Sequence, residues 1–242
     1  MTTKKVIIPD GYKDVIYRAT YYLLGKIAHF VPRSIHPNQI TIVAFLCALI
    51  GTALLYFIKT PVAYLYWTLF NFIWYILDAL DGIHARLTEQ TSEYGAFLDH
   101  ALDNIYFIFM FAIFAAKFDL LHVFYIYVIC LRITAALMVF VVQYHTKKYY
   151  LGSFTGGGEF LLFSLAMIFS YFFPHFNVAA YTTNVFLLNI IHFFNLQTGI
   201  FMKLTFFIYA VGVPFAMVSM FQFAKRELDP KLSIDRSEPA SS

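Results

Sequence analysis

Long apolar stretches, separated by short polar or glycine- and proline-containing segments, follow one another along most of the chain. A helix of about 17–25 apolar residues is long enough to cross the hydrocarbon core of a membrane. Stretches of that size lie at about residues 41–59, 61–80, 97–116, 120–143, 158–174 and 198–223. The pattern predicts an all-α integral membrane protein built as a bundle of six transmembrane helices.

Two further segments depart from this pattern. Residues 12–30 mix lysine and arginine with isoleucine, leucine and tyrosine, which predicts an N-terminal amphipathic helix lying at the membrane interface. Residues 178–195 are apolar but are interrupted by asparagines and a histidine. We interpret this second segment as an interfacial or re-entrant connection, with a seventh span as the alternative.

The distribution of charge divides the chain into three parts. Residues 1–40 form a basic segment with the interfacial helix, residues 41–223 the six-helix transmembrane domain that carries the chemistry, and residues 224–242 a polar tail predicted to be disordered. Lysine and arginine are concentrated before the first span, near residues 86 and 147–148, and in the tail. The excess predicts that both termini and the region around residue 86 face the cytosol, which requires an even number of spans.

Composition supports the same class of protein. The chain of 242 residues is 60% hydrophobic and 13% charged, whereas soluble domains carry about 25% charged residues. We therefore expect membrane lipid, and no nucleic acid, among its partners. The two cysteines, Cys47 and Cys130, lie inside apolar runs, so they indicate neither a disulfide nor a thiolate metal site.

Ionisable residues gather where the second apolar stretch ends and the third begins. Their pattern is Asp78-x2-Asp81-Gly82-x2-Ala85-Arg86-x8-Gly95-x3-Asp99-x3-Asp103. In helices, residues 78–86 of the pattern share one face and residues 95–103 form a second stripe. Two such stripes facing each other would bring four carboxylates together, which only cations make tolerable. Acidic oxygen-rich sites select hard divalent ions, so the spacing predicts a metal site.

This pattern resembles the signature of the CDP-alcohol phosphotransferases, integral membrane enzymes of phospholipid synthesis, and every fixed position of that signature is present. The resemblance implies transfer of a phosphate-linked group from a CDP-activated donor to a hydroxyl acceptor, with release of CMP. It also implies a homodimer, and two Mg²⁺ or Mn²⁺ ions held by Asp78, Asp81, Asp99 and Asp103. Asp103 would also be the proton acceptor, with His100 as the competing base because a neutral imidazole is available near pH 7.

Four other residues are predicted to contact the nucleotide. Gly82 lacks a side chain, so a nucleotide can approach the helix backbone closely, and Arg86 can pair with a phosphate oxygen. Ala85 would leave room for the nucleotide, although close helix packing would explain it equally well. Asn38 stands in a Pro-Asn-x-x-Thr segment similar to one found in the family. Its alternative role is to cap the helix that follows.

Two ionisable residues outside the signature are predicted to contact substrate. The glycine-rich segment before Glu159 resembles the Gly-Pro-x-Glu segment of choline and ethanolamine phosphotransferases, but Gly157 and Gly158 depart from that pattern. Glu159 could face a metal or a cationic head group, or simply be an acid at a helix N-terminus. Arg132 lies in the middle of a span and must face the bundle or a wet cavity. It would contact a lipid phosphate or substrate, or a structural partner such as Asp103 or a backbone carbonyl.

The substrate pair stays open between two branches of the family. Asp99-His100 and the Glu159 segment favour CDP-choline or CDP-ethanolamine with diacylglycerol. The short core favours CDP-diacylglycerol with a polar alcohol. A different class, a divalent-cation transporter using the acidic cluster, would place its site at the bilayer midplane between repeated halves. No repeat is visible in this sequence, so the transferase is the preferred interpretation.

Overall fold

The computed structural model describes residues 15–146 and 157–229, and within these ranges the chain contains helices and no strand. The elements are α1 (Val15–Ile27), η1 (Ala28–Phe30), α2 (Pro37–Phe57), α3 (Val62–Thr88), α4 (Glu93–Phe118), α5 (Val123–Thr146), α6 (Gly157–Phe172), η2 (Val178–Tyr181), α7 (Val185–Phe193) and α8 (Ile200–Leu228). The expected all-α class is thereby confirmed for the described residues.

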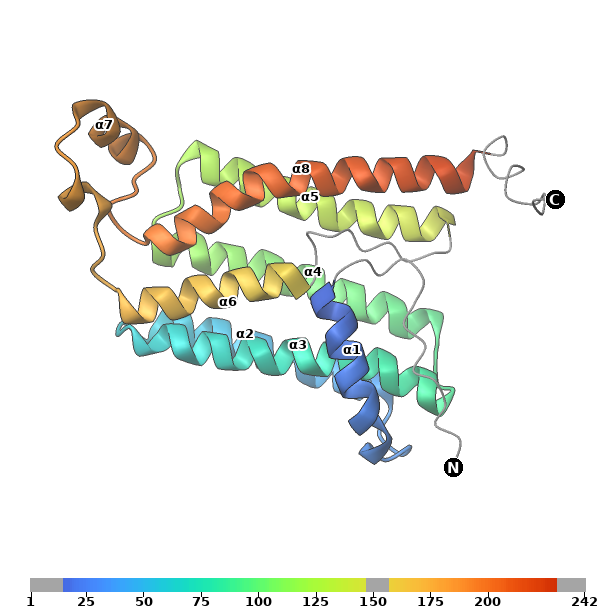
Figure 1. Ribbon diagram of the computed structural model, residues 1–242. Coiled ribbons are helices and arrows are strands. Elements are labelled where there is room, and N and C mark those ends of the chain that lie inside the picture. The colour runs from blue at the N-terminus through green and yellow to red at the C-terminus, as the bar shows by residue number, and fades with distance from the viewer. Residues whose placement is uncertain (1–14, 147–156, 230–242) are drawn as a thin grey trace, which may run out of the picture.

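Within the described ranges, the bundle is formed by helices that lie side by side along its length (Figure 1). They are α2, α3, α4, α5, α6 and α8, and each corresponds to one of the predicted apolar stretches. The segment with η2 and α7 lies at one end of the bundle, and α1 lies across the other half. Helix α7 has 9 residues, about 13 Å at a rise of 1.5 Å per residue. It is too short for a seventh crossing, so residues 178–195 form a connection.

The prediction of six membrane spans is confirmed only in part. Helices α2, α4, α5 and α8 are long and apolar enough to cross a membrane. Helix α6 is apolar but has only 16 residues. Helix α3 has 27 residues and continues to Thr88, beyond the end of the predicted apolar stretch at residue 80. Its last turns carry Asp78, Asp81 and Arg86, and this polar face lowers its apolar content without interrupting the helix.

The bundle is held together by small residues and aromatic rings. Helix α2 packs against α3 and α4, α5 packs against α8, and α6 packs against α3 and α8. At Gly51 of α2, an added Cβ would lie 2.5 Å from the Cβ of Phe70 on α3, so glycine permits this close approach. Buried rings of Trp67, Phe114 and Phe163 fill the centre of the core.

Helix α1 lies within residues 12–30, where the sequence predicts an amphipathic helix. Tyr21 and Leu24 are buried against Ala79 and Ile83 of α3. The opposite side of α1 exposes apolar residues such as Leu23. A helix with one face packed on the bundle and another apolar face exposed suits a position at the membrane interface, and that position stays a prediction.

Several predictions concern residues outside the described ranges. They include the first residues of the basic segment, Lys147 and Lys148, the glycine-rich segment up to residue 156, and the tail from residue 230. Within the described ranges, the six long helices alternate in direction, so α2 begins and α8 ends at the same end of the bundle (Figure 1). An even number of crossings has this consequence, and the cytosolic orientation itself stays a prediction.

Candidate active site

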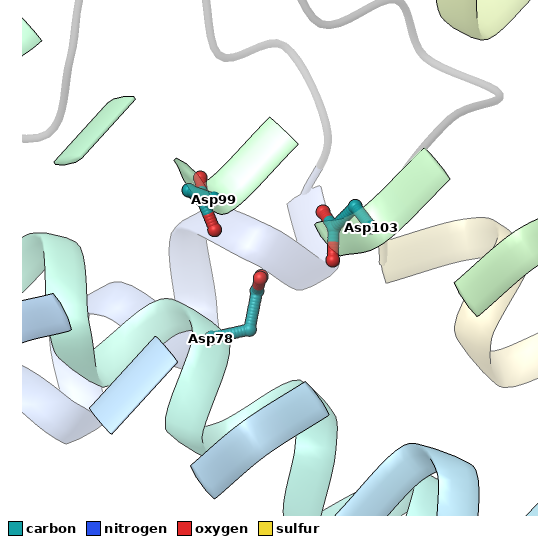
Figure 2. A group of neighbouring side chains, drawn as sticks. All are labelled: Asp78, Asp99 and Asp103. Carbon is teal, nitrogen blue, oxygen red and sulfur yellow. The ribbon is translucent and has the colours of Figure 1, made fainter. Parts of the chain in front are cut away.

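Three carboxylates converge between α3 and α4. Asp78 comes from α3, and Asp99 and Asp103 stand one turn apart on α4; one potential ligand oxygen from each lies within 4.8 Å of the others. Figure 2 shows the three side chains pointing toward one another. Three of the four carboxylates that the spacing predicts to converge therefore do so.

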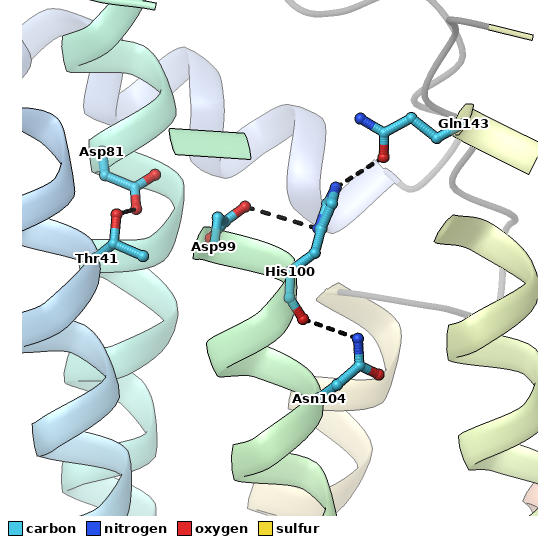
Figure 3. Close-up of polar contacts among 6 residues, drawn as sticks. All are labelled: Thr41, Asp81, Asp99, His100, Asn104 and Gln143. Carbon is cyan, nitrogen blue, oxygen red and sulfur yellow. Dashed lines mark hydrogen bonds and ion pairs between the residues drawn. The ribbon is translucent and has the colours of Figure 1, made fainter. Parts of the chain in front are cut away.

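Asp81, the fourth predicted ligand, lies outside this group of three. Its buried carboxylate accepts a hydrogen bond from the Thr41 hydroxyl of α2 (Figure 3). Three residues along a helix correspond to a rotation of about 300°, which turns Asp81 from α4 toward α2. Asp81 lines the same cavity as Asp78 and Asp99, and its role as a metal ligand stays a prediction.

The three clustered residues fit a divalent cation. Carboxylates so close together repel one another while they are ionised. Asp99 Oδ1 is buried and has no hydrogen-bond partner in the part of the chain that the structure describes. An orphaned, buried, negatively charged oxygen beside two further carboxylates is the donor set that Mg²⁺ or Mn²⁺ prefers.

A polar cavity of about 250 Å³, here called the outer pocket, opens beside the cluster. All four residues predicted to contact the nucleotide line it: Asn38, Gly82, Ala85 and Arg86. The outer pocket thus brings together side chains from α2 and α3 with the carboxylates of α4. Their contact with a nucleotide stays a prediction.

Arg86 is held over the outer pocket by an aromatic ring from α1. Its guanidinium carbon lies 5.4 Å from the centroid of the Tyr21 ring, within the range of a cation–π contact. Arg86 Nη2 is buried and lacks a hydrogen-bond partner among the described residues. An added Cβ at Gly82 would stand 3.4 Å from both terminal nitrogens of Arg86. The contact of Tyr21 with this site could not be predicted from the sequence, because only the three-dimensional packing of α1 brings Tyr21 to it.

Asn38 does not cap α2. The cap is His36, whose Nδ1 accepts a hydrogen bond from the backbone N–H of Asn38. Gln39 completes a reciprocal capping box by accepting from the backbone N–H of His36. The amide of Asn38 instead faces α4, where an added Cβ at Gly95 would lie 3.0 Å from Asn38 Oδ1. The capping alternative is therefore wrong, and Gly95 lets α4 approach α2 at this point.

A second cavity of about 110 Å³, the inner pocket, lies deeper between α3, α4, α5 and α6. Its walls are largely aromatic and include Trp74 and Phe160. Asp78, His100 and Asp103 line both pockets. The two cavities therefore share this acidic boundary.

Arg132 and Glu159 form a buried ion pair on the wall of the inner pocket. Arg132 Nε donates to Glu159 Oε1 at 2.6 Å and Nη2 donates to Oε2 at 2.5 Å. The two side chains are only 7% and 3% exposed. The partner of Arg132 is thus Glu159 rather than Asp103 or a backbone carbonyl. Contact of either residue with substrate stays a prediction.

His100 is fixed by neighbours on two sides. Its Nε2 lies 2.8 Å from Gln143 Oε1 of α5, and its Nδ1 lies 3.8 Å from Asp99 Oδ2 (Figure 3). Gln143 was not identified from the sequence, because a lone polar residue near the end of an apolar helix carries no motif. Both His100 and Asp103 stand at the boundary of the two pockets, so both remain candidates for the proton acceptor.

A model of the CDP-alcohol phosphatidyltransferase family matches residues 34–200. The chain belongs to this family. The matched region includes the three clustered aspartates, Arg132 and Glu159. The resemblance seen in the spacing of the acidic residues is thereby confirmed.

Two curated proteins are similar to parts of this family member. Choline/ethanolaminephosphotransferase 1 of Saccharomyces cerevisiae is 28% identical over 152 residues, covering 57% of this chain and 37% of that protein. Archaetidylinositol phosphate synthase of Pyrococcus horikoshii is 38% identical over 71 residues, covering 29% of this chain and 36% of that protein. The matches thus span less than two fifths of either relative.

Proposed function

We propose that this protein is a phospholipid-synthesising transferase that moves a phosphate-linked group from a CDP-activated donor to a hydroxyl acceptor and releases CMP. The observation that carries the proposal is the cluster of Asp78, Asp99 and Asp103 at the boundary between a polar and an apolar pocket. A nucleotide donor fits the first pocket and a lipid the second. Membership of the family supports this function and disfavours the cation transporter.

The donor would bind in the outer pocket with its pyrophosphate toward the carboxylates. Asp78, Asp99 and Asp103 would hold two divalent ions, with Asp81 beside them as the fourth ligand. When bound, Mg²⁺ or Mn²⁺ would supply positive charge that neutralises the pyrophosphate and stabilises the attacking and leaving oxygens. Arg86 would pair with a phosphate oxygen, and the missing side chain at Gly82 would let the nucleotide lie close to α3.

The reaction is a displacement at one phosphorus atom. The acceptor oxygen forms a bond to the phosphorus that carries the donor's alcohol group. The bond from that phosphorus to the bridging oxygen of the pyrophosphate breaks, and CMP leaves with this oxygen and its electron pair. The proton of the acceptor hydroxyl passes to Asp103, or to His100 as the competing base. Most of the acceleration would come from positioning and electrostatic stabilisation.

The inner pocket favours a lipid as the acceptor. Apart from the acidic boundary that it shares with the outer pocket, its walls are mainly aromatic and aliphatic, and its other two charged residues, Arg132 and Glu159, pair with each other. A phosphate-bearing alcohol would need a cation with free donors in this pocket. We therefore propose diacylglycerol as acceptor with CDP-choline or CDP-ethanolamine as donor. The alternative pair is CDP-diacylglycerol with a polar alcohol.

CMP release from reconstituted protein tests the proposed function. Radiolabelled CDP-choline, CDP-ethanolamine and CDP-diacylglycerol would each be supplied with diacylglycerol or with glycerol phosphate, inositol or serine, in the presence of Mg²⁺ or Mn²⁺. We expect CMP release with diacylglycerol, and none from an Asp99→Asn variant prepared in parallel. If no pair releases CMP above the level of that variant, the proposed transferase activity is wrong.

We also propose that the outer pocket and both termini face the cytosol and that the protein is a homodimer. The concentration of lysine and arginine supports the orientation, and the resemblance to the family supports the dimer. In a variant whose Cys47 and Cys130 are replaced by serine, a cysteine introduced at Thr91, beside the outer pocket, would react with an impermeant reagent only from the cytosolic side. Light scattering of the detergent-solubilised protein would measure its mass.

A further inference from the structure

Gln90 occupies a fixed position just beyond the end of α3 and lines the outer pocket. Glu89 adopts the left-handed conformation with φ 61° and ends the helix. The backbone N–H of Gln90 then donates to the carbonyl of Ala85 at 2.8 Å, as in a Schellman-type helix end. The side chain of Gln90 therefore starts from a constrained backbone, four residues beyond Arg86.

The orientation of the Gln90 amide is set by the chain itself. Its Nε2 donates to the backbone carbonyl of Arg33 at 3.0 Å. A carbonyl oxygen accepts but cannot donate, so the amide nitrogen must face Arg33 and the amide oxygen must face away from it. Arg33 is fixed in turn, because its Nη2 donates to the carbonyl of Thr88 at 3.0 Å. Gln90 is thus braced between α3 and the segment that precedes α2.

The oxygen of this amide is an acceptor without a donor. Gln90 Oε1 is buried and has no hydrogen-bond partner within the ranges that the structure describes. Buried acceptors are satisfied in almost all native proteins, and leaving one unpaired is unfavourable unless a ligand supplies the donor. The outer pocket is the cavity that Gln90 lines, so a ligand in that pocket could supply the missing N–H.

We propose that Gln90 Oε1 accepts a hydrogen bond from the exocyclic amine of cytosine and so selects cytidine over uridine donors. The inference rests on the proposed function, which places a cytidine nucleotide in the outer pocket. Cytosine offers an N–H donor at its 4-position, whereas uracil carries a carbonyl acceptor at that position. With a uridine nucleotide, the carbonyl oxygen of uracil would face Gln90 Oε1, and neither acceptor would receive a hydrogen bond.

The position of Gln90 along the site agrees with contact to the base. The clustered carboxylates and Arg86 mark the end of the pocket that suits the phosphates. Gln90 follows the C-terminal end of α3, whereas Asp78 and Asp81 lie about two to three turns before that end. Ser92 also lines the outer pocket.

The experiment compares three nucleotides by calorimetry on the purified full chain in detergent with Mg²⁺. They are CMP, UMP and the 5′-monophosphate of 2-pyrimidinone riboside, which matches cytidine but lacks the exocyclic amine. Wild-type protein should bind CMP about tenfold more tightly than the 2-pyrimidinone nucleotide, and should discriminate more strongly against UMP. The 2-pyrimidinone comparison needs no substitution, so it does not depend on how a variant folds.

A variant with its matched control completes the test. Gln90→Met keeps the length of the side chain but removes the acceptor, so it should bind CMP and the 2-pyrimidinone nucleotide equally. Gln197→Met, which alters a glutamine between α7 and α8, should keep the wild-type ratio. Equal wild-type affinity for these two nucleotides, or an unchanged ratio in Gln90→Met, would overturn the inference and leave the proposed function intact. Failure of wild-type protein to bind any of the three nucleotides would overturn both.

Discussion

Removal of one partner from the Arg132–Glu159 pair should strongly destabilise the protein. The pair links α5 to α6 through two hydrogen bonds of 2.6 and 2.5 Å, and it is almost inaccessible to solvent. Glu159→Gln would leave the guanidinium of Arg132 buried without a counter-charge. Arg132→Met would leave the carboxylate of Glu159 in the same situation.

The expected size of the effect follows from this burial. Breaking a buried ion pair by removing one partner costs about 3–5 kcal/mol. For a chain of this size, 1 kcal/mol corresponds to about 2–4 °C in melting temperature, so each single variant should melt about 6–20 °C below wild type. Replacing both partners with apolar residues, in Arg132→Met/Glu159→Leu, removes the unpaired charge. That double variant should melt within about 5 °C of wild type.

Thermal unfolding of the purified protein in detergent, followed by intrinsic tryptophan fluorescence, measures these differences. A double-mutant cycle isolates the coupling between the two side chains, and Glu93→Gln, at an exposed glutamate on α4, provides a control for loss of one acidic charge. Strictly additive effects, or single variants as stable as the control, would refute the reasoning. Turnover of the double variant adds information, because a stable but inactive double variant would support contact of the pair with substrate.

Three further predictions concern the acidic cluster. Asp81→Asn should abolish turnover and weaken Mg²⁺-dependent CMP binding at least about tenfold, measured by calorimetry; undiminished binding would remove Asp81 from the ligand set. If Asp103 accepts the proton, Asp103→Asn should reduce CMP release in a turnover assay much more than it reduces CMP affinity. If only His100→Asn loses CMP release while keeping its CMP affinity, His100 is the proton acceptor instead. Treatment with EDTA should stop CMP release, and added Mg²⁺ or Mn²⁺ should restore it; activity that persists after chelation would contradict metal dependence.

Local patterns in the sequence were sufficient to predict most of the architecture. Apolar runs bounded by charges and prolines located the six long helices, because burial in lipid or in the bundle imposes that composition. The acidic spacing predicts that four carboxylates converge, because residues at intervals of three and four share a helix face; Asp78, Asp99 and Asp103 do so, whereas Asp81 pairs with Thr41. The second apolar stretch ends near residue 80 while α3 continues to Thr88, because the charged last turns of α3 line a pocket inside the protein.

Contacts between distant segments could not be derived in the same way. The partner of Arg132 lies 27 residues away on another helix, and no local pattern specifies which helices become neighbours. The rotation of Asp81 toward Thr41 and the contact of Tyr21 with Arg86 likewise depend on how α1 and α2 pack on α3. The N-cap residue of α2, His36, could not be predicted from the sequence, because histidine is not among the preferred capping residues.

Binding of Mn²⁺ in the presence and absence of CMP tests the central claim most directly. The claim is that carboxylates of α3 and α4 hold divalent ions around a cytidine nucleotide. In an electron paramagnetic resonance titration, wild-type protein should bind Mn²⁺ more tightly when CMP is present, and Asp99→Asn should lose most of this binding. Equal Mn²⁺ affinity in wild type and Asp99→Asn, with no response to CMP in either protein, would contradict the account.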